Sequence, residues 1–379
     1  MQSNRNLGGS LPQDGTLVGR VWRADLDGPS VVTVRDGRLL DVTCRRFPSV
    51  RDLLEQDDPV ELLRAADGDD MGSLDDPKAA WQLLAPCDLQ AIKACGVTFA
   101  RSMLERVIEE RAAGDPSKAA AIRERVGAIV GESLRSLVPG SPEAVRVKQA
   151  LIDEGMWSQY LEVGIGPDAE VFTKAQPMSA VGWGADVGLH PISKWNNPEP
   201  EVVLAVDSRG RVKGATLGND VNLRDVEGRS ALLLGKAKDN NASTAIGPFI
   251  RLFDETFGMD DIRRAELDLL VEGEDGFVLN GHSSMKEISR DPLDLVAQAI
   301  GRHHQYPDGF VLFLGTLFAP VEDRDQPGQG FTHKLGDRVT ISSPALGALE
   351  NTVRLSTECQ PWTFGASALM RHLAARGLL

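Results

Sequence analysis

Hydrophobic and polar positions alternate over residues 16–43. Short Val-rich runs in this segment are separated by the turn pairs Gly28-Pro29 and Asp36-Gly37, and this pattern predicts antiparallel strands joined as hairpins. A helical pattern follows over residues 49–66, and the polar stretch DGDDMGSLDDPKAAW is typical of a linker. We therefore expect a small β-rich N-terminal domain over residues 1–85.

The most helical part of the sequence is residues 100–160. Three stretches rich in Ala, Glu and Arg each begin with Ser or Asp as an N-cap candidate and end at Gly or Pro, which predicts three helices. From about residue 161 to residue 357, short β-branched runs lie between Gly, Pro, Asn and Asp residues, which predicts strands. Two helices, near 259–266 and 291–302, are expected to interrupt these strands. The fold class expected from these patterns is α+β, mainly β, with a second domain over residues 86–379.

Composition and charge restrict the possible partners. The chain has 379 residues, of which 42% are hydrophobic and 25% are charged, an ordinary globular composition. Its formal net charge is −14, with 41 Lys and Arg against 55 Asp and Glu. The whole molecule should therefore repel nucleic acids and anionic lipids, and we expect no nucleic-acid partner and no membrane partner.

The cellular location is predicted from the cysteines and the apolar runs. No stretch approaches 18 consecutive apolar residues, and the first residues, MQSNRNLGGSLPQDGTL, lack the apolar core of a signal peptide. The four cysteines stand at irregular spacing without a CxxC pair, which argues against a zinc ribbon and against a secreted disulfide framework. We expect a cytoplasmic protein.

Three carboxylates stand at the ends of two strand-like runs. Glu199 and Glu201 are two residues apart at the start of EVVLAVD, so they project from the same face of a strand. After the turn DSRGR the chain returns as VKGATLGNDV, which would bring Asp220 beside them. Clustered carboxylates raise one another's pKa unless a cation is near, and an all-oxygen ligand set favours Mg²⁺, Mn²⁺ or Ca²⁺. The alternative interpretation is a solvated acidic rim at strand ends.

Longer motifs carry a family resemblance. The run from PEPEVVLAV through LGNDVNLRD to GKAKDNNASTAIGPFI resembles the signature of the fumarylacetoacetate hydrolase superfamily, and the similarity extends through VLFLGTLFAP to HKLGDRVTISSPALGALENTV. The resemblance implies a mixed β-sandwich or roll catalytic domain with a helical insertion at about 103–160. It also implies a Mg²⁺ site, with Mn²⁺ possible, held by Glu199, Glu201 and Asp220, and an active-site lysine at Lys238.

The same resemblance implies further site residues. Glu170 and Lys174, in DAEVFTKAQP, occupy the segment of the family's F-x-K-type strand. Glu170 could be a fourth metal ligand or a catalytic base, and Lys174 a substrate-binding residue. Thr316, in FLGTLF, matches a turn that binds the substrate carboxylate. Family members are commonly homo-oligomers, so we expect a dimer or tetramer, with the apolar segment QPWTFGASALM as a candidate subunit contact.

One departure from the family pattern changes the expected reaction. In the family's C–C bond hydrolases a His-Glu pair activates water, but in GVTFARSMLER the histidine position is Ser102, while Glu105 keeps its place. Serine has no basicity near neutral pH, so the hydrolytic pair is incomplete. The segment is similar to the family's 2-keto-3-deoxy-pentonate dehydratases, which act on acids derived from D-xylonate or D-arabinonate.

This branch implies a metal-stabilised enolate, loss of water and 2,5-dioxopentanoate as the product. Glu105 or Glu170 would take the C3 proton, the other carboxylic acid or Ser102 would protonate the leaving hydroxyl, and Arg101 or Arg106 would meet a substrate oxygen. The expected partner is a small-molecule 2-keto acid. Two alternatives stay open: a C–C bond hydrolase or decarboxylase of an acylpyruvate or 2,4-diketo sugar acid, and a non-catalytic metal- or ligand-binding module.

Overall fold

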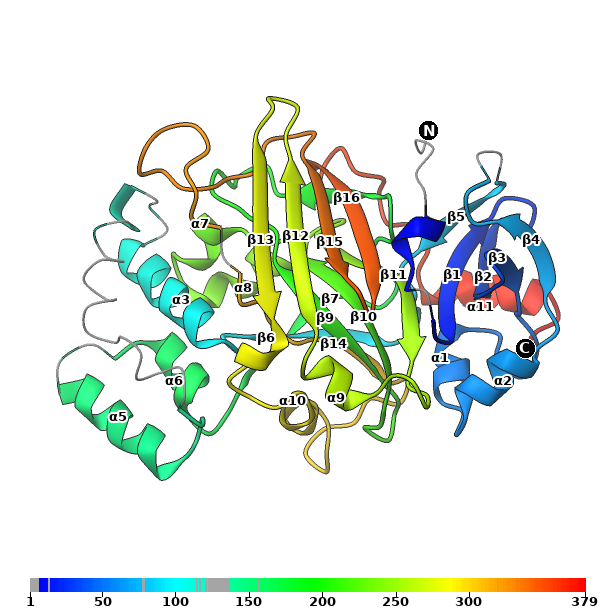
Figure 1. The fold of residues 1–379 in the computed structure, drawn as a ribbon, viewed down its shortest axis with the longest axis horizontal. Helices are drawn as coiled ribbons and strands as arrows, with labels where there is room; N and C mark the ends of the chain where they lie inside the picture. Colours follow the sequence, from blue (N-terminus) through cyan, green and yellow to red (C-terminus); the bar gives the residue numbers. More distant parts are fainter. Residues whose placement is uncertain are drawn as a thin grey trace.

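The structure, a computed structural model, consists of two β-sheets with helices at both ends (Figure 1). It describes residues 7–12, 14–76, 79–113, 115, 117–119, 121, 137–153, 155, 157–318 and 320–379. In helix α3 the side chains of residues 100–102, 104 and 109 are outside the described set. Among the described helices, none is both long enough and apolar enough to cross a membrane.

The larger sheet contains 11 strands. Their order is β4-β3-β2-β1-β11-β10-β9-β14-β6-β7, and β5 pairs with β1 beside this path. Neighbouring strands are antiparallel, except that β14 and β6 run parallel. The strands are β1 Leu17–Arg23, β2 Gly28–Arg35, β3 Arg38–Asp41, β4 Asp69–Ser73, β5 Trp81–Leu84, β6 Ala91–Gly96, β7 Glu170–Ala175, β9 Pro200–Val206, β10 Val212–Asp220, β11 Thr244–Leu252 and β14 Phe310–Phe313.

The smaller sheet contains five strands in the order β13-β12-β15-β16-β8, and β16 and β8 run parallel. Its strands are β8 Asp186–Leu189, β12 Glu266–Glu272, β13 Val278–Ser284, β15 Arg338–Ser343 and β16 Gly347–Leu355. The predicted α+β, mainly β fold is confirmed.

The two sheets pack face to face and enclose the main hydrophobic core. β15 and β16 lie against β10, β16 also lies against β11, and β12 lies against β9. Val202 and Leu204 of β9 belong to this core, whereas Val203 joins a second apolar cluster with Val311 and Phe313. Because β9 is buried on both faces, its sequence is a nearly continuous apolar run. A carboxylate on this strand is therefore held inside the protein.

The helices cover the ends of the sheets. They are α1 Val50–Leu54, α2 Pro59–Ala65, α3 Ala100–Ala112, α5 Pro142–Asp153, α6 Gln159–Ile165, α7 Arg224–Glu227, α8 Leu234–Lys238, α9 Met259–Ile262, α10 Pro292–Ala299 and α11 Ala366–Ala375, with short 3₁₀ helices η1 Gly8–Ser10, η3 Ala231–Leu233 and η4 Met285–Glu287.

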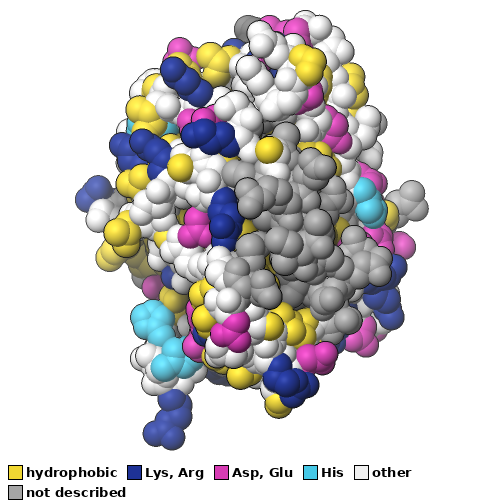
Figure 2. All heavy atoms as spheres, turned by 90° about the vertical axis from the view of Figure 1, so that its left-hand side faces the viewer, with side chains coloured by type: hydrophobic (Ala, Val, Ile, Leu, Met, Phe, Trp, Pro, Cys, Tyr) yellow, Lys and Arg dark blue, Asp and Glu magenta, His cyan; other side chains and the backbone are white. Residues whose placement is uncertain are grey.

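Helices α3, α5 and α6 gather at one end of the molecule, on the left of Figure 1. They share a separate apolar cluster that includes Met103, Val107, Leu151 and Leu161. On the face that this end presents, Lys and Arg side chains are interspersed with Asp and Glu among the described residues (Figure 2). Two of the three helices predicted here are present as α3 and α5; the middle one, at 115–138, lies mostly outside the described residues.

The N-terminal segment follows its predicted pattern with one difference. The hairpins expected over residues 16–43 are β1, β2 and β3. The helical pattern at 49–66 is two helices instead of one, because Asp58 caps α2 by accepting a hydrogen bond from the Glu61 N–H, and Pro59 is the first residue of that helix. Proline cannot continue a preceding helix but is well tolerated at a first turn.

The N-terminal strands and the C-terminal helix both attach to the larger sheet. β1 pairs with β11, with Leu17 opposite Arg251 and Val18 opposite Ile250, and α11 lies against β2. Residues 17–84 therefore extend the sheet that carries the acidic strand β9. The division of the chain into domains at residue 85 stays a prediction.

Candidate functional site

The β9–β10 hairpin brings the three predicted carboxylates together. Gly218 of β10 stands opposite Glu201 of β9, and the Asp220 N–H donates to the Glu199 carbonyl at 3.1 Å. One carboxylate oxygen from each of Glu199, Glu201 and Asp220 lies within 4.8 Å of the others. The three residues are 4%, 2% and 1% exposed, so they form an interior cluster and not a solvated rim.

Two cationic side chains hold the Glu199 end of this cluster. Lys238 Nζ donates to Glu199 at 2.8 Å and to Asp220 at 3.1 Å. The Arg106 guanidinium donates to the other oxygen of Glu199 at 2.6 Å. Burial alone would lower the pKa of Lys238, but Asp220 and Glu199 raise it well above its usual value, so this ammonium stays charged.

The three carboxylates do not share this compensation equally. Burial raises the pKa of Glu199, but Lys238 and Arg106 oppose it, and the result is a pKa below the usual value. Burial, reinforced by the charges of Asp220 and Glu199, holds the pKa of Glu201 well above its usual value. Glu201 accepts the Gly315 N–H at 2.6 Å, which compensates it only in part. The donor set therefore fits a hard divalent cation, since oxygen ligands are those that Mg²⁺ and Mn²⁺ prefer.

Lys174 lies beneath the cluster. Its side chain is fully buried, and Nζ donates to the carbonyls of Lys238 at 2.7 Å and Ser243 at 3.0 Å, with Asp220 at 3.3 Å. Burial lowers the pKa of Lys174. This lysine is outside the described lining of the cavity above the cluster. Its contacts therefore indicate that it holds Asp220 and the Lys238 backbone in place, and not that it touches the substrate.

A cavity opens above the carboxylates, and we call it the carboxylate cavity. The described residues that line it are Cys95, Gly96, Val97, Arg106, Glu170, Phe172, Glu199, Glu201, Asp220, Glu227, Lys238, Gly315 and Thr316. The structure thus brings Glu170, Arg106 and Thr316 together with the cluster and Lys238. The free volume is about 20 Å³, room for about one water molecule, so a larger ligand requires a side chain to move.

Glu170 faces this cavity from the first residue of β7. It stands opposite Gly96 of β6, and a Cβ at position 96 would collide with the Glu170 carboxylate. Glycine at this position leaves the space that the carboxylate occupies. Burial raises the pKa of Glu170, although Arg106 and Lys238 oppose it. A carboxyl group with a raised pKa in a cavity is a candidate for accepting and returning a proton.

Glu227 is a cavity residue that the sequence patterns did not indicate. This residue of α7 is 4% exposed and binds the second side of the Arg106 guanidinium at 2.9 Å. Arg106 therefore spans from Glu199 to Glu227 across the cavity. The available signal was an acidic residue seven positions after Asp220, inside the segment that resembles the family motif.

Glu105 contacts the buried Arg224. Its carboxylate is 3.5 Å from the Arg224 guanidinium, which stacks on Trp195 at 4.4 Å and donates to the Pro320 carbonyl at 2.9 Å. Glu105 is outside the described lining of the carboxylate cavity. Arg101 and Ser102 lie on α3, but their side chains are outside the described residues, so their predicted roles stay predictions.

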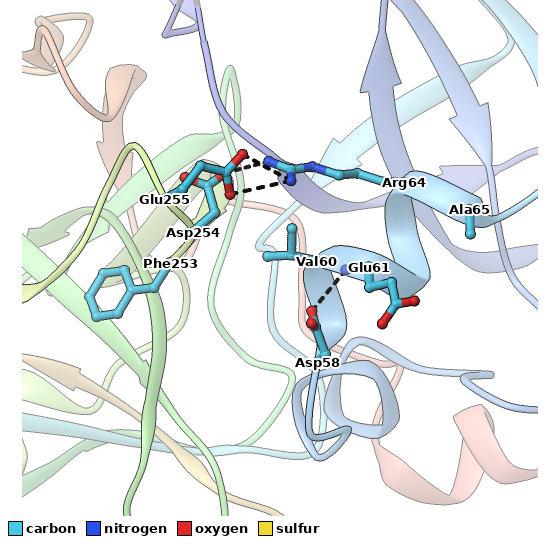
Figure 3. Close-up of a pocket in the computed structure, with 8 residues that line it drawn as sticks. All are labelled: Asp58, Val60, Glu61, Arg64, Ala65, Phe253, Asp254 and Glu255. Carbon is cyan, nitrogen blue, oxygen red and sulfur yellow. Dashed lines mark hydrogen bonds and ion pairs between the residues drawn. The ribbon is translucent and has the colours of Figure 1, made fainter.

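A different pocket, of about 500 Å³, lies between α2 and the turn after β11 (Figure 3). Arg64 there binds Asp254 at 2.8 Å and Glu255 at 3.1 Å. These charges already compensate one another, and none of the predicted site residues lines this pocket. The carboxylate cavity is therefore the candidate active site.

Comparison with known proteins gives a family match. The family model described as "Fumarylacetoacetate (FAA) hydrolase C-terminal" matches residues 165–354, a range that contains Glu170, the three clustered carboxylates, Lys238 and Thr316. The match thus covers half of the chain, including most of the cavity lining.

Two curated relatives are similar over parts of the chain. "Probable 2-keto-3-deoxyxylonate dehydratase" of Haloferax volcanii is 30% identical over 201 residues, 53% of this chain and 65% of that protein. "2-dehydro-3-deoxy-D-arabinonate dehydratase" of Saccharolobus solfataricus is 30% identical over 155 residues, 41% of this chain and 51% of that protein. The matched part is therefore less than two thirds of either relative.

A solved structure supports the fold over nearly the whole chain. The structure described as "2-keto-3-deoxy-D-arabinonate dehydratase complexed with magnesium and 2,5-dioxopentanoate" matches with a TM-score of 0.62 at 20% identity, covering 89% of this chain and 99% of that one. At this level of identity the likeness concerns the arrangement of the two sheets and their helices.

Proposed function

Because the chain belongs to the fumarylacetoacetate hydrolase family, we propose that it is a metal-dependent dehydratase. Its substrate would be a 2-keto-3-deoxy-pentonate derived from D-xylonate or D-arabinonate, and its product 2,5-dioxopentanoate. The observation that carries the proposal is the buried cluster of Glu199, Glu201 and Asp220 with Lys238 at its edge. The names of the two curated relatives and of the magnesium complex support the substrate class.

Glu199, Glu201 and Asp220 would hold the Mg²⁺ ion, with Mn²⁺ as an alternative. A bound divalent cation would draw electron density from a keto oxygen and so make the C3 hydrogens more acidic. Lys238 adds a fixed positive charge at the same place. An ammonium has three donors, and two of them bind Glu199 and Asp220, so the third is available to the substrate oxygen on which negative charge develops.

Glu170 is the base in this proposal. It lines the cavity, its pKa is raised by burial, and no cationic side chain lies within 4.0 Å of it among the described residues. It can therefore take the proton from C3. Glu105, by contrast, lies against Arg224 and outside the described cavity lining, which makes it the weaker candidate of the two.

The bond changes balance with the loss of one water. Glu170 removes a C3 proton, the electrons of that bond form the C3–C4 double bond, and the C4 hydroxyl leaves with a proton from a carboxylic acid or from Ser102. The resulting enone has a C5 hydroxyl, and transfer of a C5 proton toward C3 followed by tautomerisation gives the aldehyde. Arg106 would turn from Glu199 to a substrate oxygen, which also enlarges the small cavity.

The test is product analysis with 2-keto-3-deoxy-D-xylonate and 2-keto-3-deoxy-D-arabinonate in the presence of Mg²⁺. We expect one product, 2,5-dioxopentanoate, and loss of its formation in Glu199→Ala. Glu272→Gln, on β12 outside the cavity, is the control. Release of pyruvate and a second acid would instead identify a C–C bond hydrolase, and unchanged turnover in Glu199→Ala would reject the site.

Three further properties stay predictions. We propose a cytoplasmic location, assembly as a homodimer or tetramer, and a small N-terminal domain that ends at residue 85. The absence of a CxxC pair supports the first, and the apolar C-terminal segment with Trp362, which is 46% exposed, supports the second. Sedimentation of the purified chain would measure the assembly directly.

A further inference from the structure

A buried arginine outside the carboxylate cavity has no acidic partner among the described residues. Arg20, on β1, is 6% exposed, and its guanidinium donates to the Cys87 carbonyl. Within the described part of the chain, no carboxylate oxygen lies within 4.0 Å of it, and its Nε has no acceptor. Buried charges are normally paired, because an isolated one costs several kcal/mol. The guanidinium therefore has donor capacity that the described residues leave unused.

A second unused donor lies in the same place. Trp183 is 7% exposed, and its Nε1 finds no acceptor among the described residues. The two side chains are brought close by β5, since Leu84 stands opposite Arg20 in the sheet and Gly182 lies directly on the Leu84 backbone. Both line one groove. Two buried N–H donors on residues that line one groove are suited to an anion.

The groove has a volume of about 1130 Å³, and we call it the N-terminal groove. Its floor is the face of β1 and β5 that carries Arg20 and Trp22, and its walls are residues 178–186 and 359–364. The segment 359–364 precedes α11, which lies against β2 and behind the N-terminal strands in Figure 1. The apolar lining includes Trp22 and Phe364, whose rings meet edge to face at 5.1 Å, and Trp362. An apolar or aromatic body therefore fits beside the two donors.

The backbone around the groove has an uncommon conformation. Met178 and Ala242, which line it, have φ angles of 67° and 58°, in the left-handed region that non-glycine residues rarely adopt. Such residues are held by their surroundings and concentrate at binding sites. The groove shares no described lining residue with the carboxylate cavity.

We propose that the N-terminal groove binds an organic carboxylate with an apolar or aromatic body. The carboxylate accepts hydrogen bonds from Arg20 Nε and Trp183 Nε1, and the body lies against Trp22, Trp362 and Phe364. A small molecule is favoured over an acidic side chain of a second copy, because both donors belong to buried side chains of a groove of about 1130 Å³. This site is independent of the proposed dehydration.

The experiment is calorimetric titration of the full chain with benzoate, acetate and benzamide, in EDTA so that no metal site contributes. We expect saturable binding of benzoate, binding at least about tenfold weaker for benzamide, which has the same shape without the charge, and weaker binding for acetate, which lacks the ring. Trp183→Phe, which keeps an aromatic ring and removes the N–H, should weaken benzoate binding at least about tenfold, because it removes a hydrogen bond to a charged group.

The matched arginine variants sharpen the test. Arg20→Gln should reduce benzoate affinity more than tenfold, whereas Arg251→Gln, at a buried arginine of β11 that stacks on Phe257 outside the groove, should leave it unchanged. Equal affinity for benzoate and benzamide in the wild type would overturn the proposal, and this comparison needs no variant to fold. Unchanged benzoate binding in Trp183→Phe would also overturn it. A third contrary result is a wild type that binds no benzoate, together with groove variants that no longer form a dimer, because the groove would then be a subunit contact.

Discussion

The carboxylate cavity and the N-terminal groove differ in how their buried charges are balanced. In and beneath the cavity, every described lysine and arginine binds one or more carboxylates, as Lys238 does with Glu199 and Asp220. In the groove, Arg20 binds a backbone carbonyl and no described carboxylate. A buried cationic side chain is therefore neutralised by carboxylates in the cavity, whereas in the groove the described residues provide no counter-charge for Arg20.

The excess charge in each place has an opposite sign. The cavity and its floor contain five described carboxylates and three described cations, namely Glu170, Glu199, Glu201, Asp220 and Glu227 with Arg106, Lys174 and Lys238. With all of them ionised, two negative charges remain, the number that one divalent cation neutralises. Among the charged residues described in the groove lining, Arg20 is buried, whereas Asp27, Asp186 and Arg354 are exposed, so the one buried charge there is positive. Unbalanced buried charge thus indicates a cation in the cavity and an anion in the groove.

The largest effect is expected from Lys238→Met. This change removes the ammonium that would face the developing negative charge, and loss of one such donor lowers turnover by about a hundredfold to a thousandfold. The measurement is the steady-state rate of 2,5-dioxopentanoate formation. Lys236→Met, at an exposed lysine on the same helix α8, is the matched control and should keep the wild-type rate. A fall of less than tenfold in Lys238→Met would remove this residue from the mechanism.

Glu170→Gln should lower turnover by about a hundredfold or more, because a positioned base contributes that much to proton transfer. The affinity for Mn²⁺, followed by electron paramagnetic resonance, should change less than about threefold. This pair of measurements separates the two roles open to Glu170. If turnover and Mn²⁺ affinity fall together, the residue is a metal ligand.

A smaller effect is expected from Glu227→Gln. Arg106 then loses one of the two carboxylates that bind it among the described residues and rests more fully on Glu199, where it competes with the metal. Changes at groups that position metal ligands typically cost 10- to 100-fold in affinity, so we expect Mn²⁺ affinity to fall about tenfold. Arg20→Gln, in the groove, should leave Mn²⁺ affinity as it is in the wild type. Equal losses in both variants would mean that the two places are not independent.

The smallest effect is on the pH profile. Burial raises the pKa of Glu170 above its ordinary value of 4.5, and a base acts only when deprotonated, so kcat should fall as the pH drops through this raised pKa. The acidic limb should lie above pH 4.5 in the wild type and be absent from the residual activity of Glu170→Gln. The same limb in both enzymes would assign it to another group.

Local sequence patterns predicted the part of the site that lies on one hairpin. Glu199 directly precedes β9, Glu201 lies on β9 and Asp220 ends the neighbouring antiparallel strand β10. The two-residue period with a short turn places them together. The prediction needed no knowledge of the rest of the fold. The short helices near 259–266 and 291–302 were likewise predicted, although α9 ends already at Ile262.

Contacts between distant segments could not be predicted in this way. Arg106 and Glu227 are 121 positions apart, and neither sequence neighbourhood indicates the other. The burial of Lys174 depends on the turn that follows Lys238, whose carbonyl accepts its hydrogen bond. In the sequence, Arg20 is an ordinary residue of a strand-like run. That no described carboxylate pairs with it can be seen only in the folded structure.

The most direct test of the metal site is calorimetric titration of Mn²⁺ into the metal-free chain and into Glu201→Gln. We expect one site per chain in the wild type and at least about a hundredfold weaker binding in the variant, because Glu201 is the clustered carboxylate with the least compensation from the protein. Equal Mn²⁺ affinity in the two proteins would contradict the claim that this buried cluster exists to hold a divalent cation.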